Sequence, residues 1–420
     1  MREMKDSGVA WIGVIPQDWE IVRTKSLYCS AKEIAGDRAD DFERLALTLN
    51  GVIKRSKEDS VGLQPEKFSG YQILKKGELV FKLIDLENVA TSRVGLSPYT
   101  GIVSPAYIVL SKQSRAKDLV VRYSMYHFLS MWQREIFNQM GDNGVRSSLN
   151  AKELLNIPHP FPSIYEQKRI VTFLDAQCAK IDAVLEKTRA SIEEYKKLKQ
   201  AVITQAVTKG IRGDRPMKDS GIEWIGEIPA EWGVVPHKRI MHKVKEICEQ
   251  YNGEDIISLT VNGAVKRDLT AGGKMPTSFD GYQYVEPNDL LLCLFDIDVT
   301  PRCVGVVRDY GVTSPAYSRF VMHDGYYNAY YDYLLRMIDD NKVFVHLSKN
   351  LRSSLTESDF GAIKTCAPPL AEQKCIAAFL DVRCDEIDAL IAKKQQYLTE
   401  IENYKKSLIY EYVTGKKEVV

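Results

Sequence analysis

The chain has 420 residues, of which 45% are hydrophobic and 27% are charged, and its formal net charge is +1. This length and composition predict two folded domains and exclude a disordered chain. No run of about 18 apolar residues is present and the first residues lack the apolar stretch of a signal peptide, so we expect a cytoplasmic protein without a membrane span. The eight cysteines form no C-x-x-C pair, which favours reduced thiols and no metal site.

The first segment of the chain returns in its second half. Residues Met4–Glu20 and Met217–Gly233 share eleven of seventeen positions at an offset of 213, including the W-I-G-x-I-P-x-x-W pattern. Residues Glu166–Asp175 and Glu372–Asp381 share seven of ten positions at an offset of 206. A period of this length is far beyond that of a solenoid repeat, so the chain contains two domains in tandem.

The offset between the repeats falls from 213 to 206 along the globular part and is then constant from Arg146 and Arg352 to Thr208 and Thr414. Insertions are tolerated in surface loops but not in a packed periodic element. Each half is therefore predicted to be a variable globular domain followed by a segment of constrained length.

The globular parts, about residues 20–160 and 233–368, read as mixed α/β. Short apolar runs of strand length occur at residues 78–84, 102–103, 107–110 and 289–295. Helical stretches are predicted at about residues 123–139 and 327–339.

The constrained segments are predicted to be long helices. Each follows prolines, contains no internal Pro or Gly, and ends before Gly210 or Gly415. Apolar residues recur at three- and four-residue spacing on an otherwise polar helix, and one helix cannot bury such a stripe by itself. We expect the two helices to pair as an antiparallel coiled coil; the alternative is two helices that each pack on their own domain. The seam is predicted at Ile181, Ile192, Leu198, Leu390, Ile401 and Leu408.

Several catalytic patterns are absent from the sequence. It contains no phosphate-binding G-x-x-x-x-G-K-[ST], no G-x-G-x-x-G, no N-P-P-[YF], no H-E-x-x-H and no G-x-S-x-G. The six histidines do not recur at equivalent positions, so a duplicated histidine-based active site is not expected. We predict no catalytic residues in this chain.

Two variable α/β domains, each closed by prolines, the pattern E-Q-x-x-I-x-x-F-L-D and a long helix, resemble the specificity subunit of type I restriction–modification enzymes. The resemblance covers the whole chain and rests on Trp11-Ile12-Gly13, Pro16, Trp19, Glu166-Gln167 and Phe173-Leu174-Asp175, all of which occur twice. It implies two target recognition domains, each reading half of a bipartite, asymmetric sequence in double-stranded DNA. The helices would fix the distance between the two domains. Modules that read one face of B-DNA have centres about 34–36 Å apart.

The resemblance also implies partners: two modification (methyltransferase) subunits and two restriction (ATPase and nuclease) subunits. S-adenosylmethionine, ATP and Mg would be used by those partners, and no cofactor is expected in this chain. The implied fold is a tandem repeat with pseudo-two-fold character. Its expected divisions are recognition domain 1 (residues 1–163), helix 1 (164–210), recognition domain 2 (211–369), helix 2 (370–415) and a tail (416–420).

The net charge near neutrality does not exclude DNA binding, because basic residues are clustered at matching places in the two repeats. Arginine and lysine contact guanine edges and phosphates, and asparagine contacts adenine. For each candidate the alternative is a solvated surface charge. The predicted DNA-binding residues are Lys54, Arg55, Lys57, Lys82, Arg93, Asn143, Arg146 and Ser147 in the first domain, and Lys266, Arg267, Arg302, Lys349, Asn350, Arg352 and Ser353 in the second.

The paired tryptophans Trp11/Trp19 and Trp224/Trp232 are predicted to be core anchors rather than platforms on which bases stack. Two other readings stay open at this point. One is a coiled-coil scaffold or adaptor that does not read DNA, and the other is a nuclease or methyltransferase with an unrecognised site.

Overall fold

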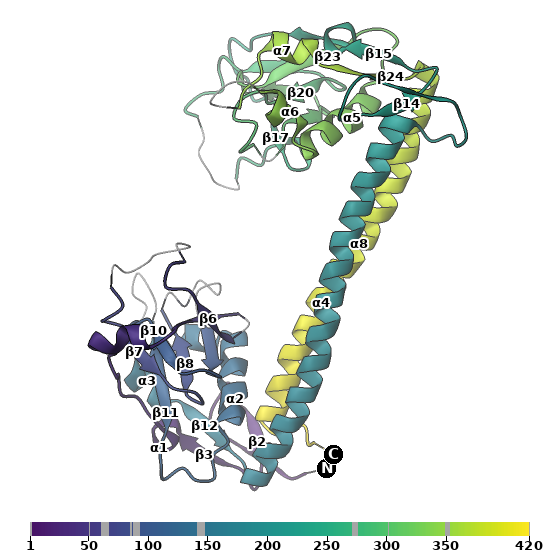
Figure 1. Ribbon diagram of the computed structural model, residues 1–420. Helices are drawn as coiled ribbons and strands as arrows, with labels where there is room; N and C mark the ends of the chain where they lie inside the picture. Colours follow the sequence, from purple (N-terminus) through teal and green to yellow (C-terminus); the bar gives the residue numbers. More distant parts are fainter. Residues whose placement is uncertain are drawn as a thin grey trace. The chain divides into compact units, whose positions relative to one another are not determined.

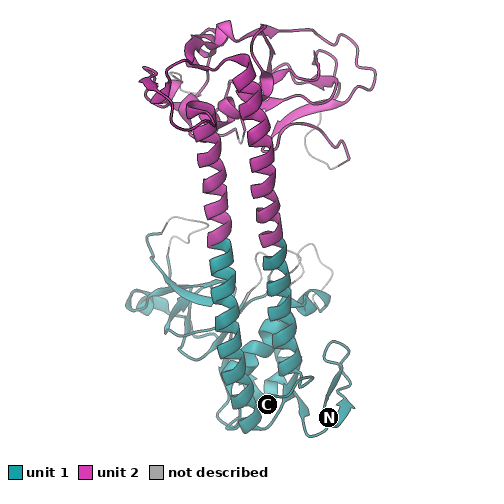
Figure 2. Ribbon diagram, turned by 90° about the vertical axis from the view of Figure 1, so that its right-hand side faces the viewer, with its two compact units in different colours: residues 1–189, 396–420 teal, residues 190–395 magenta. Residues whose placement is uncertain are grey.

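The computed structural model describes residues 2–49, 51–59, 67–84, 86, 93–140, 148–270, 276–300, 302–348 and 353–419. Two compact units divide the chain (Figure 2). Unit 1 contains residues 1–189 and 396–420, and unit 2 contains residues 190–395. Each long helix is thus shared between the units, rather than standing apart from the globular domains.

Unit 1 is built from short strands around two four-stranded sheets. Its strands are β1 (Met4–Asp6), β2 (Val14–Pro16), β3 (Glu20–Arg23), β4 (Tyr28–Cys29), β5 (Arg44–Thr48), β6 (Gly51–Arg55), β7 (Gln72–Leu74), β8 (Leu79–Lys82), β9 (Arg93–Leu96), β10 (Gly101–Val103), β11 (Ile108–Lys112) and β12 (Pro158–Phe161). The sheet orders are β6-β5-β10-β7 and β4-β11-β8-β9, and β1-β2 and β12-β3 form two-stranded pairs. The β5–β10 pair is parallel, whereas the other pairs are antiparallel.

Unit 2 repeats this topology strand for strand. Its strands are β13 (Met217–Asp219), β14 (Glu227–Pro229), β15 (Gly233–Pro236), β16 (Met241–Val244), β17 (Ile256–Thr260), β18 (Gly263–Lys266), β19 (Gln283–Val285), β20 (Leu290–Leu292), β21 (Val304–Val306), β22 (Gly311–Thr313), β23 (Ser318–Met322) and β24 (Lys364–Ala367). The sheet orders β18-β17-β22-β19 and β16-β23-β20-β21 match those of unit 1, and β13-β14 and β15-β24 complete the set. The predicted duplication of a mixed α/β domain is confirmed.

The shorter helices cover the sheets and fill the connections between strands. They are α1 (Thr24–Leu27), η1 (Gly36–Asp41), α2 (Val121–Gln133), η2 (Ile136–Gln139) and α3 (Ala151–Asn156) in unit 1, and η3 (His237–Arg239), α5 (Asn328–Asp340), α6 (Val343–Leu347) and α7 (Glu357–Ala362) in unit 2. Helix α2 has two buried faces. Phe128 and Met131 pack on the sheet core, while Tyr123 and Tyr126 pack on the core that contains the long helices. α2 therefore connects the sheets of unit 1 to its helix pair.

The two long helices are α4 (Ile164–Lys209) and α8 (Leu370–Val413), drawn in teal and yellow in Figure 1. Both begin just after the proline clusters and end before Gly210 and Gly415, as the sequence predicts. These glycines adopt positive φ angles of 75° and 68°, a backbone conformation that favours glycine and ends a helix. Among the described residues, no helix has an apolar stretch that could span a bilayer.

The helices run antiparallel within each unit. In unit 1, Asp182 of α4 pairs with Lys405 of α8 at 2.6 Å. In unit 2, Lys199 pairs with Asp388 at 2.5 Å. These two bridges are the same pair repeated, because Asp182 and Lys199 lie 206 positions before Asp388 and Lys405. The expected antiparallel pairing of the helices is present in both units.

The predicted seam residues do not all occupy the same environment. Ile181, Ile192 and Leu408 are buried and Ile401 is half-buried. Leu198 and Leu390 are 47% and 41% exposed, so these two differ from the expectation. Each directly precedes a residue at the seam: Lys199 pairs across it with Asp388, and Ile391 is buried. The apolar stripe read from the sequence is therefore wider than the seam.

Candidate functional site

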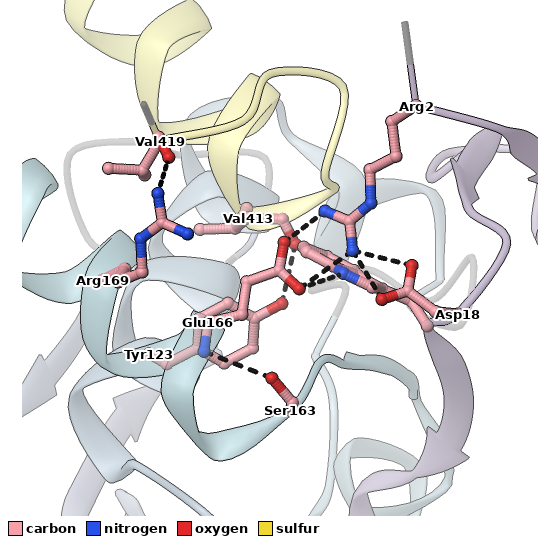
Figure 3. Close-up of polar contacts among 9 residues, drawn as sticks. Arg2, Asp18, Tyr123, Ser163, Glu166, Arg169, Val413 and Val419 are labelled. Carbon is pink, nitrogen blue, oxygen red and sulfur yellow. Dashed lines mark hydrogen bonds and ion pairs between the residues drawn. The ribbon is translucent and has the colours of Figure 1, made fainter.

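In unit 1, the carboxylate of Glu166 in the first turn of α4 binds two side chains (Figure 3). Trp19 Nε1 donates a hydrogen bond to Glu166 Oε2 at 2.8 Å, and Arg2 forms an ion pair with both carboxylate oxygens. Arg2 also bonds Asp18 at 2.7 Å. The hydrogen bond to Glu166 raises the pKa of Arg2 above its ordinary value. A carboxylate at this end of the helix also interacts favourably with the helix dipole.

Unit 2 contains the same arrangement in a more buried form. Trp232 Nε1 donates to Glu372 Oε2 at 2.9 Å, and Arg215 Nη1 bonds Glu372 Oε1 at 2.6 Å and Glu231 at 3.0 Å. The side chains of Arg215 and Glu372 are 10% and 8% exposed, compared with 23% and 18% for Arg2 and Glu166. We call each Arg–Glu–Trp set a helix clamp, because it attaches the start of a long helix to the N-terminal strands of its unit.

The glutamine that follows the clamp glutamate is buried and fully bonded. Gln167 Oε1 accepts from the Val120 backbone at 2.8 Å and its amide donates to Pro162 O at 2.9 Å. Gln373 makes the equivalent bonds to Tyr327 and Pro368 at 2.7 and 2.8 Å. The repeated E-Q pair therefore connects the long helix, the proline segment and the start of α2 or α5.

A tyrosine of each globular domain caps the end of the other long helix. Tyr123 OH donates to Val413 O of α8 at 2.9 Å, and Tyr330 OH donates to Val207 O of α4 at 2.8 Å (Figure 3 shows the first). The carbonyls at a helix end have no partner within the helix, so these bonds help to satisfy buried acceptors. Cys366 Sγ also donates to Val207 O at 3.2 Å. Each globular domain thus holds the start of one long helix and the end of the other.

The aspartate of the F-L-D motif accepts a tyrosine hydroxyl in both units. The distances are 2.6 Å from Tyr126 to Asp175 and 2.8 Å from Tyr333 to Asp381. Trp19 and Trp232 are 0% and 1% exposed, which confirms that they are core anchors; Trp11 and Trp224 are half-buried. The repeated motifs consequently build the framework, and the surfaces between them are left for recognition.

The predicted DNA-binding residues of β6 and β18 occupy equivalent places. Lys54 and Lys266 lie on edge strands, are 51% and 60% exposed, and each forms a 2.6 Å ion pair, with Glu43 and Asp255 respectively. Lys54 also lies over the Tyr99 ring, 5.2 Å from its centroid. Lysine on an edge strand also prevents strand addition, so this placement has a structural explanation beside the DNA-binding one.

Three further candidates lie near these strands. Arg55 pairs with Asp59 at 2.7 Å, and Lys57 donates to Ala39 O at 2.9 Å and contacts Asp40 at 3.4 Å. Arg267 is half-buried and its backbone N–H bonds Ile256 O at 2.7 Å. The basic residues after the β5–β6 and β17–β18 turns therefore gather on one hairpin in each unit.

The ends of β8 and β20 differ between the units. Lys82 faces Arg93 across the β8–β9 ladder. At the equivalent point of unit 2, the Cys293 N–H donates to Cys303 O at 2.8 Å, and both cysteines are buried. The register thus pairs a lysine with an arginine in unit 1, whereas two cysteines occupy the equivalent positions in unit 2. The residue of unit 2 that corresponds to Arg93 is Cys303, and Arg302 lies one position earlier.

Arg302 is held within unit 2. Its side chain is 18% exposed and pairs with Asp340 at 2.8 Å and with Asp339 at 3.8 Å, both on α5. These acidic partners lie at the end of the second helical stretch and could not be assigned to Arg302 from sequence spacing.

Six of the predicted residues lie outside the described part of the chain: Asn143, Arg146, Ser147, Lys349, Asn350 and Arg352. The residues that follow them are described. Ser148 forms a bridge with Ile84 just beyond β8, and Ser353 O accepts from Ile297 N at 3.1 Å beyond β20. Ser148 and Ser353 therefore lie just beyond the ends of the equivalent strands β8 and β20.

The sequence analysis did not identify Arg2, Arg215, Gln167 or Tyr123 as framework residues. A signal was present for the arginines, because Arg2 and Arg215 are separated by the same 213 positions as the repeated motif that follows them. Tyr123 and Tyr330 are separated by 207 positions and gave no comparable pattern.

The geometry defines a class of protein: two copies of a variable sheet domain clamped to a shared pair of helices. Residues 16–194 match the family model described as Type I restriction modification DNA specificity domain. Two curated proteins of Methanocaldococcus jannaschii are similar over nearly their whole length. The putative type I restriction enzyme MjaX specificity subunit is 24% identical over 97% of this chain and 96% of its own, and the MjaVIII specificity subunit is 25% identical over 96% and 94%.

One solved structure, from work on the complex assembly and conformational transition of the type I R-M system, has the same fold. Its TM-score is 0.70 at 14% identity, and the match covers 96% of this chain and 99% of that chain. The first part of the chain thus matches a type I restriction–modification DNA specificity domain, and nearly the whole chain is similar to type I restriction enzyme specificity subunits.

Proposed function

We propose that this chain is the non-catalytic subunit that selects the DNA target of a type I restriction–modification enzyme. Each globular domain reads one half of a bipartite, asymmetric sequence in double-stranded DNA. The observation that carries the proposal is the contrast between an identical strand order in the two units and different residues at matching strand ends, Lys82 and Arg93 against Cys293 and Cys303. A shared framework with unlike surfaces fits two modules that read unlike half-sites.

The hairpins that carry Lys54 and Lys266 support DNA contact. A two-stranded β-ribbon fits the major groove of B-DNA, and lysines beside it reach phosphates. Both lysines already pair with a carboxylate at 2.6 Å. Exchange of that partner for a phosphate would retain a charge-assisted bond and release counterions from the DNA.

The helix pair provides a face for protein partners. Val184 and Tyr404 in unit 1, and Leu198 and Leu390 in unit 2, are 38–55% exposed, and each lies one residue before a seam position. In antiparallel helices with heptad spacing such positions lie on the same side of the seam. We assign this apolar side to two modification subunits. Two restriction subunits complete the enzyme, and S-adenosylmethionine, ATP and Mg are used by the partner subunits.

Methylation mapping tests the proposal directly. Genomic DNA from cells that contain this chain and its modification subunit should carry methylated adenine in a split motif with a fixed gap. Replacing residues 21–157 by the same region of a relative should change one half of the motif and leave the gap intact. The graft ends are adjacent in the fold, because Thr24 N donates to Ile157 O at 3.0 Å.

The matched graft is residues 234–363 of unit 2, whose ends are joined in the same way by His237 N and Ile363 O at 2.9 Å. It should change the other half of the motif. Methylation that does not depend on this chain would favour a scaffold without DNA readout. A single graft that alters both halves would show that the units do not read DNA independently.

A further inference from the structure

The hairpins β5–β6 and β17–β18 carry exposed apolar side chains at equivalent positions. On the edge strands, Ile53 is 43% exposed and Val265 is 36% exposed. At the turns, Leu49 and Val261 are 67% and 62% exposed. The members of each pair are 212 positions apart (265 − 53 and 261 − 49), which is the offset of the surrounding repeat. The two units thus present the same kind of side chain at the same places on one hairpin.

The register of the first hairpin separates its apolar side chain from its lysine. Successive side chains of a strand point to opposite faces of the sheet. Val52 packs in the core with Leu45, so Ile53 lies on the opposite, outward face of the sheet. Lys54 is on the core side again, where it pairs with Glu43 at 2.6 Å.

The second hairpin has the same division. Ala264 packs in the core with Ile257, so Val265 lies on the outward face. Lys266 is on the core side and pairs with Asp255 at 2.6 Å. In each unit the lysine and the adjacent apolar residue therefore face different ways, and they serve different contacts.

The outward faces share a simple chemical pattern. The residue directly across the ladder from the exposed apolar side chain is small, Ala46 in unit 1 and Ser258 in unit 2. Two positions after the apolar residue, and on the same face, comes an arginine, Arg55 or Arg267. Each outward face therefore offers the methyl groups of a β-branched side chain beside a cation. The floor and walls of the major groove match this pattern, since thymine methyl groups lie between phosphates.

We propose that the outward face of each hairpin enters the major groove, where Ile53 and Val265 each contact the 5-methyl group of a thymine. Among the base pairs only A·T and T·A present this methyl group, and apolar side chains recognise it. The lysines on the other face contact the phosphates beside the groove. The inference rests on the proposed function and adds to it the chemical group that each hairpin reads.

Uracil in place of thymine tests the contact, because it removes only the methyl group and keeps the base pair. Once methylation mapping has given the motif, synthetic duplexes carry uracil at one thymine position at a time. Their binding to the complex of the full chain with its modification subunits is measured by fluorescence anisotropy. Each half-site should contain a position at which uracil weakens binding about fourfold, the effect of one buried methyl group.

Substitutions in the hairpins assign each contact to its residue. In Ile53→Ala, uracil should no longer weaken binding at the position in the half-site that the graft of residues 21–157 changes. The position in the other half-site should keep its fourfold effect. Val265→Ala should give the reverse result. Both side chains are partly exposed, so thermal unfolding should change little.

The chain offers a matched pair of control residues in Ile34 and Ile247. They are also equivalent and are 47% and 41% exposed. They bridge to Gln72 and Gln283, at the opposite edge of the same sheets from the hairpins. In Ile34→Ala and Ile247→Ala, uracil should weaken binding as it does with the wild-type chain.

The outcomes separate the two levels of inference. If no split motif is methylated, the proposed function fails. If a split motif is methylated but uracil weakens binding at no thymine of a half-site, the methyl contact is refuted while the proposed function stands; this result needs no variant of the protein. A uracil effect that persists in folded Ile53→Ala and Val265→Ala would also overturn the proposal. Loss of modification-subunit binding in these variants, with the uracil effect intact, would assign the outward face to a protein contact instead.

Discussion

Trp232 and Glu372 are joined by a hydrogen bond of 2.9 Å between the indole nitrogen and a carboxylate oxygen, and Trp19 and Glu166 repeat it at 2.8 Å. The residues of each pair are separated by 140 and 147 positions. The bond therefore fixes a long helix to strands far away in the sequence. This structural role explains why both residue types recur in the two halves of the chain.

The first prediction concerns the strength of the clamp. Glu372→Ala should destabilise the protein by about 3 kcal/mol, because Arg215 loses its buried charge partner and keeps only the more exposed Glu231. Glu166→Ala should cost less, since Arg2 and Glu166 are more exposed. Urea unfolding followed by tryptophan fluorescence provides the measurement. Trp232→Phe is the control that removes only the indole donor, at a cost of about 1 kcal/mol. An equal loss of unfolding free energy in Glu166→Ala and Glu372→Ala would contradict the prediction that the more buried clamp contributes more stability.

The second prediction concerns pH. Burial lowers the pKa of His159 and of His237 to about 4, and lowers that of His127 well below 6.5. Between pH 4 and 6.5 the unfolded chain then binds more protons than the folded one. The stability contributed by each neutral ring is complete above pH 6.5 and is lost as the pH falls towards 4, by up to about 3 kcal/mol per histidine.

His237→Thr is a suitable control for this titration. Thr24 occupies the same place in unit 1 and donates to Ile157 O at 2.8 Å, so threonine can replace the ring. The variant should show a shallower loss of stability between pH 6.5 and 4 in urea unfolding. An unchanged slope would mean that His237 does not remain neutral in the folded protein.

The third prediction concerns the lysines of the two hairpins. Lys54→Gln and Lys266→Gln should each weaken DNA binding by the assembled enzyme. If each lysine contacts one phosphate, the slope of log affinity against log salt should fall by about 1 in each variant. Lys112→Gln tests a lysine that bonds backbone carbonyls within unit 1 and should leave the slope unchanged. Aggregation of the hairpin variants with unaltered DNA affinity would instead assign the lysines to protection of the sheet edge.

The fourth prediction separates the seam from the docking side. Leu408→Asp places a charge in a buried position, 5% exposed, and should unfold the helix pair of unit 1 and prevent assembly. Leu198→Asp alters a residue that is 47% exposed, so the chain should stay folded and lose affinity for the modification subunit alone. Size-exclusion chromatography and circular dichroism distinguish these outcomes. If the Leu198→Asp variant is unfolded, Leu198 is a seam residue and not part of the docking side.

The repeat at offsets of 213 to 206 was sufficient to predict the duplicated domain, and local patterns were sufficient to predict the bounds of α4 and α8. Prolines, glycines and a three- and four-residue apolar spacing act within a few residues of one another, and their physical effect is local. The order of the strands is not local. The parallel contact between β5 and β10, for example, joins Arg44 to Ile102 across a stretch that no turn pattern spans.

Part of the candidate site could also be predicted, because the repeat aligns equivalent residues of the two halves. The repeat placed Lys54 and Lys266 at equivalent positions, and both are exposed on edge strands. Sequence spacing could not show that Arg302 pairs with α5, because its acidic partners lie 37 and 38 positions away (339 − 302 and 340 − 302). It also could not separate Leu198 from the true seam positions, because seam and docking side are adjacent on the same helix face.

The last prediction concerns the order of elements in the chain. Unit 1 contains both the first and the last described residues. After α8 ends, Lys416 Nζ donates to Ile12 O at 2.7 Å. Arg169 of α4 donates to the carbonyl of Val419, and Glu166, one turn earlier in α4, binds Arg2. The chain ends are thus held by the same turn of α4.

Linking residue 420 to residue 1 with a short flexible linker and opening the chain near Gly213 should give a folded protein. It should direct methylation to the same split motif with the same gap, because every clamp and cap is retained. Methylation mapping is the measurement, with circular dichroism and solubility as controls for folding. A folded permutant that alters the gap would show that the continuity of the chain between α4 and β13, rather than the helix pair, sets the spacing.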